Sequence, residues 1–140
     1  MKNRLLLTIN LVFTLCVAIN GNAAIKTNIT PVDLRCEYLV NPLGIDNTSP
    51  RLSWKLLGDL MVRGQKQIAY QVLVASSLEN INRNIADVWD SEKVHSNQSV
   101  NNIYAGVSLL SAKQYFWKVR IWNQEGRVSK WSRKAYFSTG

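Results

Sequence analysis

The sequence has few of the residues from which catalytic and metal sites are usually built. Its 140 residues include one histidine, His95, and two cysteines, Cys16 and Cys36. A single histidine excludes metal sites made of several histidines and acid–base schemes that pair two of them. Neither a glycine-rich phosphate-binding loop nor a Gly-x-Ser-x-Gly turn occurs along the chain. The composition therefore predicts no cofactor and no metal ion, and we interpret His95 as an exposed loop residue.

Acidic residues are also scarce, with 9 aspartates and glutamates against 17 lysines and arginines. Three of them, Asp87, Asp90 and Glu92, lie close together in the sequence. On a strand, Asp90 and Glu92 would project to one side, closer together than the acid and base of a glycoside hydrolase need to be. We therefore interpret this group as a solvated strand edge. The basic residues are scattered and form no recognition motif, so the net charge of +8 does not indicate a nucleic-acid partner.

The N-terminal segment has the features of a secretory signal peptide. Lys2 and Arg4 precede an apolar run from Leu5 to Ile19, and the small residues needed for cleavage follow at 21–24. We predict a signal peptide at residues 1–24 and a leader at 25–30, and we expect the protein to be secreted or periplasmic. A retained anchor or lipidation is the alternative.

Cleavage after Ala24 would leave 116 residues with a net charge of +6 and a single cysteine, Cys36. That length allows one domain with an ordinary core, and one cysteine allows no intramolecular disulfide. We therefore interpret Cys36 as a small buried hydrophobic residue and expect stability to come from packing. No interaction with a membrane is expected after cleavage.

Beyond Pro31 the apolar residues recur at every second position, which is typical of strands that bury one face. The strands predicted in this way are 51–56, 69–75, 114–122 and 134–139, with weaker ones at 87–94 and 99–105. Segment 69–75 is apolar on both faces and is predicted to be central. The predicted inward faces are Leu52, Trp54 and Leu56; Tyr115, Trp117, Val119 and Ile121; and Ala135 and Phe137.

One segment departs from the two-residue period. Ser76 and Glu79 have the spacing of a capping box at the start of a helix. The apolar face of that helix would consist of Leu78, Ile81 and Ile85. We predict a short helix at 77–85.

These elements predict an all-β protein, an immunoglobulin-like β-sandwich of about seven strands with one short helix, spanning residues 31–140. Three details favour the fibronectin type III variety. The Cys…Trp…Cys spacing of immunoglobulin domains is missing, and Trp54 falls on the second strand. In addition, Leu109 precedes Tyr115 at the spacing of a tyrosine corner, in which the phenol hydroxyl bonds back to the preceding loop.

A partial motif follows the strand that contains Tyr115. Residues 129–132 form half of a Trp-Ser-x-Trp-Ser pattern, with Val128 where the first tryptophan would be. We predict that Trp131 stacks with Lys118 or Arg120 on the adjacent strand, in cation–π contacts worth about 0.5–1 kcal/mol each.

A longer pattern carries a resemblance to a known family. Its core is the stretch 34–46 (Leu-Arg-Cys-Glu-Tyr-Leu-Val-Asn-Pro-Leu-Gly-Ile-Asp), followed by Ser-Pro-Arg-Leu-Ser-Trp at 49–54. Further phrases match in order at 67–75, 87–94, 115–120 and 131–137. Together they resemble the N-terminal fibronectin type III-like domain of bacterial α-L-rhamnosidases of glycoside hydrolase family 78, over about 31–140.

The resemblance implies a non-catalytic accessory domain of a secreted hydrolase, acting in scaffolding or substrate presentation. In that family catalysis belongs to an (α/α)-barrel domain far downstream, whose acid and base have no counterpart here, so no catalytic residue is carried over. The chain would then be a fragment of such an enzyme or a stand-alone domain. The expected partners are the remaining domains of a rhamnosidase-like enzyme and, in addition, a plant-type oligosaccharide.

Two candidate interaction surfaces follow. The first is a turn that either clamps against the sandwich or docks the enzyme body, and it consists of Asn41, Pro42, Leu43, Gly44, Ile45 and Asp46. Docking predicts that Ile45→Asp weakens association without unfolding the domain. The second is an aromatic surface of Trp89, Trp122 and Trp131 that would stack on sugar rings. The alternative function is accordingly a free-standing secreted carbohydrate-binding or protein-binding module, and a receptor or adhesion module is a third class.

Overall fold

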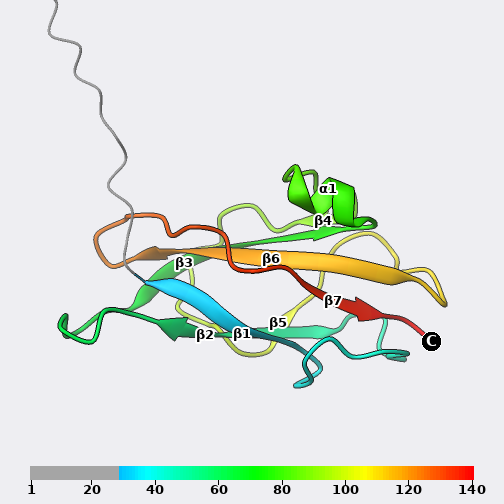
Figure 1. Cartoon of the computed structure of the whole chain (residues 1–140), viewed down its shortest axis with the longest axis horizontal. Helices are drawn as coiled ribbons and strands as arrows, with labels where there is room; N and C mark the ends of the chain where they lie inside the picture. Colours follow the sequence, from blue (N-terminus) through cyan, green and yellow to red (C-terminus); the bar gives the residue numbers. More distant parts are fainter. Residues whose placement is uncertain (1–28) are drawn as a thin grey trace, which may run out of the picture.

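The computed structural model describes residues 29–140, and the predicted signal peptide at 1–24 lies outside them. Within the described range the chain forms seven strands and one short helix in two facing layers (Figure 1). The elements are β1 (Thr30–Cys36), β2 (Arg51–Leu57), β3 (Gln67–Ala75), α1 (Leu78–Asn82), β4 (Trp89–Asp90), β5 (Asn102–Ile103), β6 (Gln114–Asn123) and β7 (Ala135–Ser138). The predicted all-β class is confirmed.

The two layers are antiparallel sheets with the strand orders β1-β2-β5 and β4-β3-β6-β7. β3 lies between β4 and β6, in agreement with the central position predicted from its apolar faces. A three-stranded sheet facing a four-stranded one in an immunoglobulin-like sandwich is the predicted architecture. α1 lies outside the second sheet, above β3 (Figure 1).

The core is formed by the alternating inward residues of both sheets. On β6 these are Tyr115, Trp117, Val119 and Ile121, each at most 3% exposed, and on β7 they are Ala135 and Phe137. The alternation predicted for both strands is confirmed. From the other sheet Leu52 and Trp54 pack against this set. The buried Trp54 indole N–H donates to Gln67 Oε1 at 3.0 Å, so its polar atom is satisfied inside the core.

β2 departs from its predicted pattern at one end. Leu52 and Trp54 are buried as expected, but Leu56, predicted to share their face, is 37% exposed. The last three residues of β2 are all exposed, so the core covers only the first part of the strand. Alternation predicts which side a residue faces, whereas burial also requires an opposing layer at that point.

The predicted capping box is wrong by one residue. The N-cap of α1 is Ser77, whose Oγ accepts from the Asn80 backbone N–H at 3.1 Å. The hydroxyl of Ser76 is bonded instead to the carboxylate of Asp87, and the Ser76 backbone N–H donates to the same carboxylate. The helix is also shorter than 77–85, since it ends at Asn82 and Asn84 has a positive φ. Of its predicted apolar face only Ile81 is buried, while Leu78 and Ile85 are exposed.

The tyrosine corner is confirmed. The backbone N–H of Leu110 donates to the hydroxyl oxygen of Tyr115 at 2.8 Å, which ties the loop before β6 to the core. Cys36 at the end of β1 is buried, as expected, and burial together with the neighbouring Glu37 charge raises the pKa of its thiol to about 12. The fold begins slightly before residue 31, since Thr30 opens β1 and Ile29 is 2% exposed.

Candidate functional site

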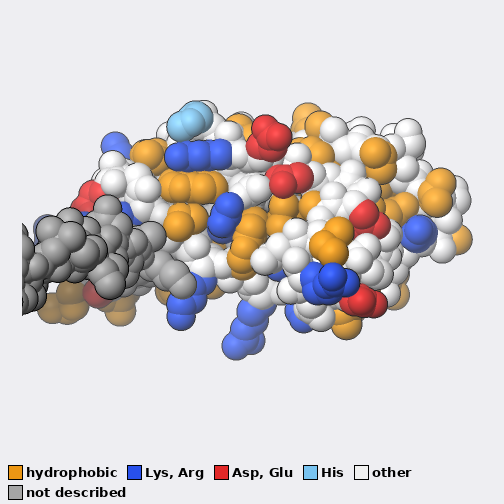
Figure 2. Space-filling model, turned by 90° about the horizontal axis from the view of Figure 1, so that it is seen from above, with side chains coloured by type: hydrophobic (Ala, Val, Ile, Leu, Met, Phe, Trp, Pro, Cys, Tyr) orange, Lys and Arg blue, Asp and Glu red, His pale blue; other side chains and the backbone are white. Residues whose placement is uncertain are grey.

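A stripe of alternating aromatic and basic side chains crosses the outer face of the β4-β3-β6-β7 sheet. Arg120 on β6 lies 5.2 Å from the Trp122 ring centre and 4.6 Å from that of Trp131. Lys93 lies 4.8 Å from Trp122 at one end, and Lys118 lies 5.3 Å from Trp131 at the other. Interleaved orange and blue side chains are visible over this face in Figure 2. The predicted stacking of Trp131 on Lys118 or Arg120 is confirmed, and both cations take part.

Two serines hold the segment before β7 against β6. The hydroxyl of Ser132 accepts from the Val119 backbone N–H at 3.0 Å and donates to the Arg133 carbonyl. The hydroxyl of Ser129 does the same three residues earlier, accepting from Ile121 N–H at 3.0 Å. Each serine hydroxyl accepts the hydrogen bond that a backbone carbonyl of a neighbouring strand would otherwise accept from β6. The spacing between the two serines therefore places Trp131 over β6. In the half Trp-Ser motif, the serines therefore bind β6 and the tryptophan packs on it.

Lys118 links the stripe to α1. Its side chain is buried, and its Nζ donates to the Ile81 carbonyl at 2.6 Å and to Asn84 Oδ1 at 2.5 Å. Burial and the charge of Lys134 hold the pKa of Lys118 below its usual value. The lysine therefore ties the end of α1 to the sheet without a carboxylate partner.

The structure separates the three tryptophans of the predicted aromatic surface. Trp122 and Trp131 lie together in the stripe, each half-buried with two cations against its ring. Trp89 is also half-buried but belongs to β4, where it packs edge-on to Tyr104 with 5.3 Å between ring centres. Two of the three thus share a surface, and the third packs on the core.

The predicted turn at 41–46 is clamped against the last strand. Asn41 Oδ1 accepts from Tyr136 N–H at 3.0 Å, and the Pro42 carbonyl accepts from Ser138 N–H at 3.0 Å. Ile45 N–H then donates to the Ser138 carbonyl at 2.8 Å. Gly44 has a φ of +67°, a backbone conformation that favours glycine. The turn is therefore hydrogen-bonded along the edge of β7.

Within this turn the apolar side chains differ in their surroundings. Leu43 is 74% exposed, whereas Ile45 is half-buried and packs against the core. A substitution at Ile45 would consequently disturb packing as well as any docking contact. Leu43 is the residue of the turn that is free to meet a partner.

A second clamp, at Glu37, Tyr38 and Arg51, was not assigned a role from the sequence. Glu37 Oε1 accepts from the Arg51 backbone N–H at 2.6 Å, and Glu37 Oε2 accepts from Arg51 Nη2 at 2.5 Å. Hydrogen bonds from the Arg51 side chain hold the pKa of Glu37 below its usual value. The Arg51 guanidinium also lies 4.7 Å from the Tyr38 ring centre. Glu37 and Tyr38 both have positive φ, so these bonds stabilise a tight turn between β1 and the next segment.

The titratable groups outside these clusters either form hydrogen bonds with neighbouring residues or are exposed to solvent. Asp87 is held by Ser76; burial opposes its ionisation, but hydrogen bonds from Ser76, from Asn80 and from its own backbone together lower its pKa. Asp90 accepts from Gln71 Nε2 at 2.8 Å, and Glu92 and His95 are exposed. Among residues 29–140, no group of three or more His, Cys, Asp or Glu side chains is arranged to hold a metal ion. In the same range no helix is long and apolar enough to cross a membrane.

The sandwich, its tyrosine corner and its clamped edge define an immunoglobulin-like domain. Residues 31–140 match the model of the family described as Rha78A-like, N-terminal immunoglobulin domain. The chain belongs to this family.

Several relatives and solved structures that resemble this chain are α-L-rhamnosidases. One from Formosa agariphila is 34% identical over 99% of this chain, and one from Streptomyces avermitilis is 45% identical over 74% of it. The structure of α-L-rhamnosidase from Dictyoglumus thermophilum is 49% identical over 79% of this chain, with a TM-score of 0.76. That of the Streptomyces avermitilis enzyme complexed with L-rhamnose gives 42% over 80%, with a TM-score of 0.74.

The match covers a small part of each relative. This chain spans 14% and 10% of the two curated enzymes, and 12% and 10% of the two solved chains. It therefore corresponds to the small N-terminal domain of these enzymes and not to their catalytic domain.

Proposed function

We propose that this chain is a non-catalytic accessory domain of a rhamnosidase-like glycoside hydrolase, which packs against the remaining domains and supports them or presents substrate to them. The observation that carries the proposal is the match of residues 31–140 to an N-terminal domain of far longer enzymes. On this proposal the purified chain does not hydrolyse an aryl α-L-rhamnoside. We also propose that it is exported by the signal peptide at 1–24.

One end of the sandwich is best suited to such packing. Gly140 lies there, with its N–H donating to the Ile45 carbonyl at 3.1 Å and its carbonyl accepting from Ala112 N–H at 3.1 Å. The C-terminus is marked at this end in Figure 1. In the relatives the corresponding domain is N-terminal, so the rest of each enzyme follows from this position.

The same end has the shape and composition of a contact surface. Two hollows of about 220 and 380 Å³ lie there and share Thr48 and Leu109 in their linings. Leu110 and Val107, which line one hollow each, are 61% and 59% exposed, and Leu43 nearby on the clamped turn is 74% exposed. Exposed apolar side chains around hollows favour burial against another domain.

A chimeric enzyme tests this proposal. Residues 29–140 replace the equivalent domain of the Dictyoglumus thermophilum relative, and Leu43→Asp is then introduced. Because a charge at a packed interface loses its hydration, the chimera should unfold at a lower temperature and lose rhamnosidase activity on heating sooner. Leu43 is exposed in the isolated chain, whose stability should change by less than about 0.5 kcal/mol.

Leu60→Asp is the matched control, since Leu60 is 97% exposed in the connection between β2 and β3 and lines neither hollow. It should leave the chimera unchanged. Equal unfolding temperatures for the Leu43→Asp and Leu60→Asp chimeras would contradict docking through this end. Rhamnosidase activity of the isolated chain would contradict the accessory role itself.

The alternative, a free-standing carbohydrate-binding module that uses the tryptophans, has less support. The rings of Trp122 and Trp131 each already have two cations against them, which limits their use as platforms for a sugar ring. A saturable change of tryptophan fluorescence with rhamnose-containing oligosaccharides, abolished by Trp122→Ala, would favour this alternative.

A further inference from the structure

A groove runs along the seam between the two sheets. One wall is β1 from Thr30 to Leu34, and the other is the segment from Lys130 to Ala135 before and at the start of β7, with Val40 and Asn41 completing the lining. Its volume is about 550 Å³, within the range of roughly 300–1,000 Å³ typical of small-molecule sites. We call it the seam groove.

The seam groove carries a surplus of positive charge. Lys130, Arg133 and Lys134 line one wall, and all three are exposed. Among residues 29–140, neither Lys130 nor Arg133 has an ion-pair partner, and Lys134 Nζ donates to the neutral amide oxygen of Asn82 at 2.6 Å. Three uncompensated cations along one wall attract an anion.

The acid on the opposite wall does not cancel this charge. Asp33 is bonded to Lys55 Nζ at 2.8 Å and to Arg35 Nε at 3.2 Å, and both cations lie outside the groove lining. These bonds hold the pKa of Asp33 below its usual value, so its carboxylate is ionised and already neutralised by its own partners. The groove thus presents Lys130, Arg133 and Lys134 to a ligand without a competing acid.

The remainder of the lining is apolar and held in place. Pro31, Val32 and Leu34 contribute from β1, and Trp131 contributes from the other wall. Trp131 is fixed by Arg120 and by the serine bonds of its segment to β6. A ligand with both anionic groups and apolar ring faces would match this lining, and the apolar wall would need no rearrangement to receive it.

The β1 edge does not favour an added peptide strand. Pro31 has no N–H to donate, and Asp33 has a φ of +49° at an irregularity in the pairing of β1 with β2. Both features interrupt the regular row of backbone donors and acceptors that strand addition requires. The groove is therefore better suited to a ligand that is recognised through charge and apolar faces.

We propose that the seam groove binds an acidic oligosaccharide, with uronate carboxylates on Lys130, Arg133 and Lys134 and a pyranose C–H face against Val32 and Val40 of the lining. Arginine suits this role because its planar guanidinium pairs with a carboxylate through two hydrogen bonds. The proposal does not depend on docking at the C-terminal end, since the groove shares no lining residue with the two hollows there.

Calorimetric titration of the purified chain with trigalacturonate, at low salt, tests the proposal. Trigalacturonate should bind at least about tenfold more tightly than the neutral trimer maltotriose, a difference of ~1.4 kcal/mol. The double variant Lys130→Gln/Arg133→Gln should weaken trigalacturonate binding by about tenfold or more. Both side chains are exposed, so the variant is expected to fold, which its thermal unfolding checks.

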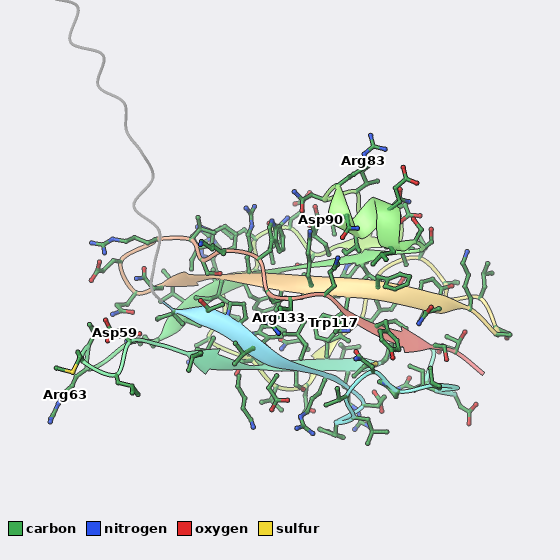
Figure 3. All side chains as sticks on the ribbon, in the orientation of Figure 1. Asp59, Arg63, Arg83, Asp90, Trp117 and Arg133 are labelled. Atoms are coloured by element: carbon green, nitrogen blue, oxygen red, sulfur yellow. The ribbon has the colours of Figure 1, made fainter. Side chains whose placement is uncertain are left out.

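The matched control is Arg63→Gln/Lys66→Gln, which removes one arginine and one lysine from the connection between β2 and β3. Figure 3 labels Arg63 at the tip of that connection and Arg133 near the middle of the molecule. The control should change binding by less than twofold. The proposal is overturned by absence of trigalacturonate binding, by equal losses in the two double variants, or by equally tight binding of hexaglutamate, which would indicate an acidic peptide instead.

Discussion

The guanidinium of Arg120 lies 4.6 Å from the centre of the Trp131 ring, across the gap between β6 and the segment that precedes β7. The two residues come from opposite sides of a hairpin, and Ser129 and Ser132 fix their spacing through bonds to β6. Because that segment has no regular strand pairing of its own before Ala135, the stacking and the two serines hold it in place. The stripe therefore holds the segment before β7 against the outer face of the sheet.

A double-mutant cycle measures how much the contact of Arg120 with Trp131 contributes to stability. Arg120→Met and Trp131→Leu, made singly and together, should show a coupling of about 0.5–1 kcal/mol in the free energy of unfolding in urea. Arg133→Met is the control, because Arg133 is close to Trp131 in sequence but no contact of its guanidinium with that ring is present. A coupling no larger than that of the control would show that Trp131 packs only as an apolar residue.

Ser132→Ala should be the more costly change in the same segment. The hydroxyl is buried and bonded to both Val119 N–H and the Arg133 carbonyl, so its removal leaves a buried donor without a partner. The expected loss is about 1–3 kcal/mol in the free energy of unfolding. Ser108→Ala, at an exposed loop position, should change stability by less than about 0.5 kcal/mol. Equal effects of the two changes would contradict the role given to Ser132.

Tyr115→Phe isolates the hydrogen bond of the tyrosine corner. The ring stays in the core, 3% exposed, while the acceptor for Leu110 N–H is lost. We expect a loss of about 0.5–1.5 kcal/mol by chemical denaturation and faster hydrogen exchange at Leu110. Tyr136→Phe is the control, since its half-buried hydroxyl has no hydrogen-bond partner among residues 29–140. Unchanged exchange at Leu110 would contradict the corner's role in ordering the loop.

The sandwich could be predicted because its strands bury one face over most of their length. β6 shows this most clearly: Tyr115, Trp117, Val119 and Ile121 are all buried at every second position, although Lys118 between them is buried as well. The partial Trp-Ser motif also predicted a contact of Trp131 with Lys118 or Arg120, and both contacts are present, because the serine spacing fixes which side chains face the strand. Patterns within single segments were therefore sufficient to predict both the sandwich and the Trp131 contact.

Features that depend on distant segments could not be predicted. The capping-box spacing to Glu79 favours Ser76 in the sequence, but in the structure Asp87 binds Ser76 from beyond the helix and Ser77 is the cap. The seam groove likewise joins Pro31 and Arg133, which lie at opposite ends of the described chain. No pattern within a single segment contains such a pairing.

Glu37 should give the domain an acid-sensitive component of stability. Hydrogen bonds from Arg51 lower the pKa of Glu37 in the fold, so the unfolded chain binds a proton at higher pH than the folded one does. This stability is present above the unfolded pKa of about 4.5 and is lost as the pH falls through the lower, folded pKa. Glu37→Gln should therefore reduce the decline of stability below pH 4.5, measured by urea unfolding from pH 3 to 7. A decline as steep as in the parent chain would contradict this assignment.

Cys36 should make the free energy of unfolding fall as the pH rises in the alkaline range. Burial raises the pKa of its thiol from 9.0 to about 12, so the unfolded chain loses the thiol proton first. The corresponding stability is present below pH 9.0 and declines as the pH rises toward 12, at up to roughly 1.4 kcal/mol per pH unit. Urea unfolding between pH 8 and 10 should show this slope in the parent chain and a shallower one in Cys36→Ala, whatever the absolute cost of the smaller side chain. The lowered pKa of Lys118 contributes a rise over part of the alkaline range, but it does so equally in both proteins and cancels in the comparison. Identical slopes would show that Cys36 ionises as readily in the folded domain as in the unfolded chain.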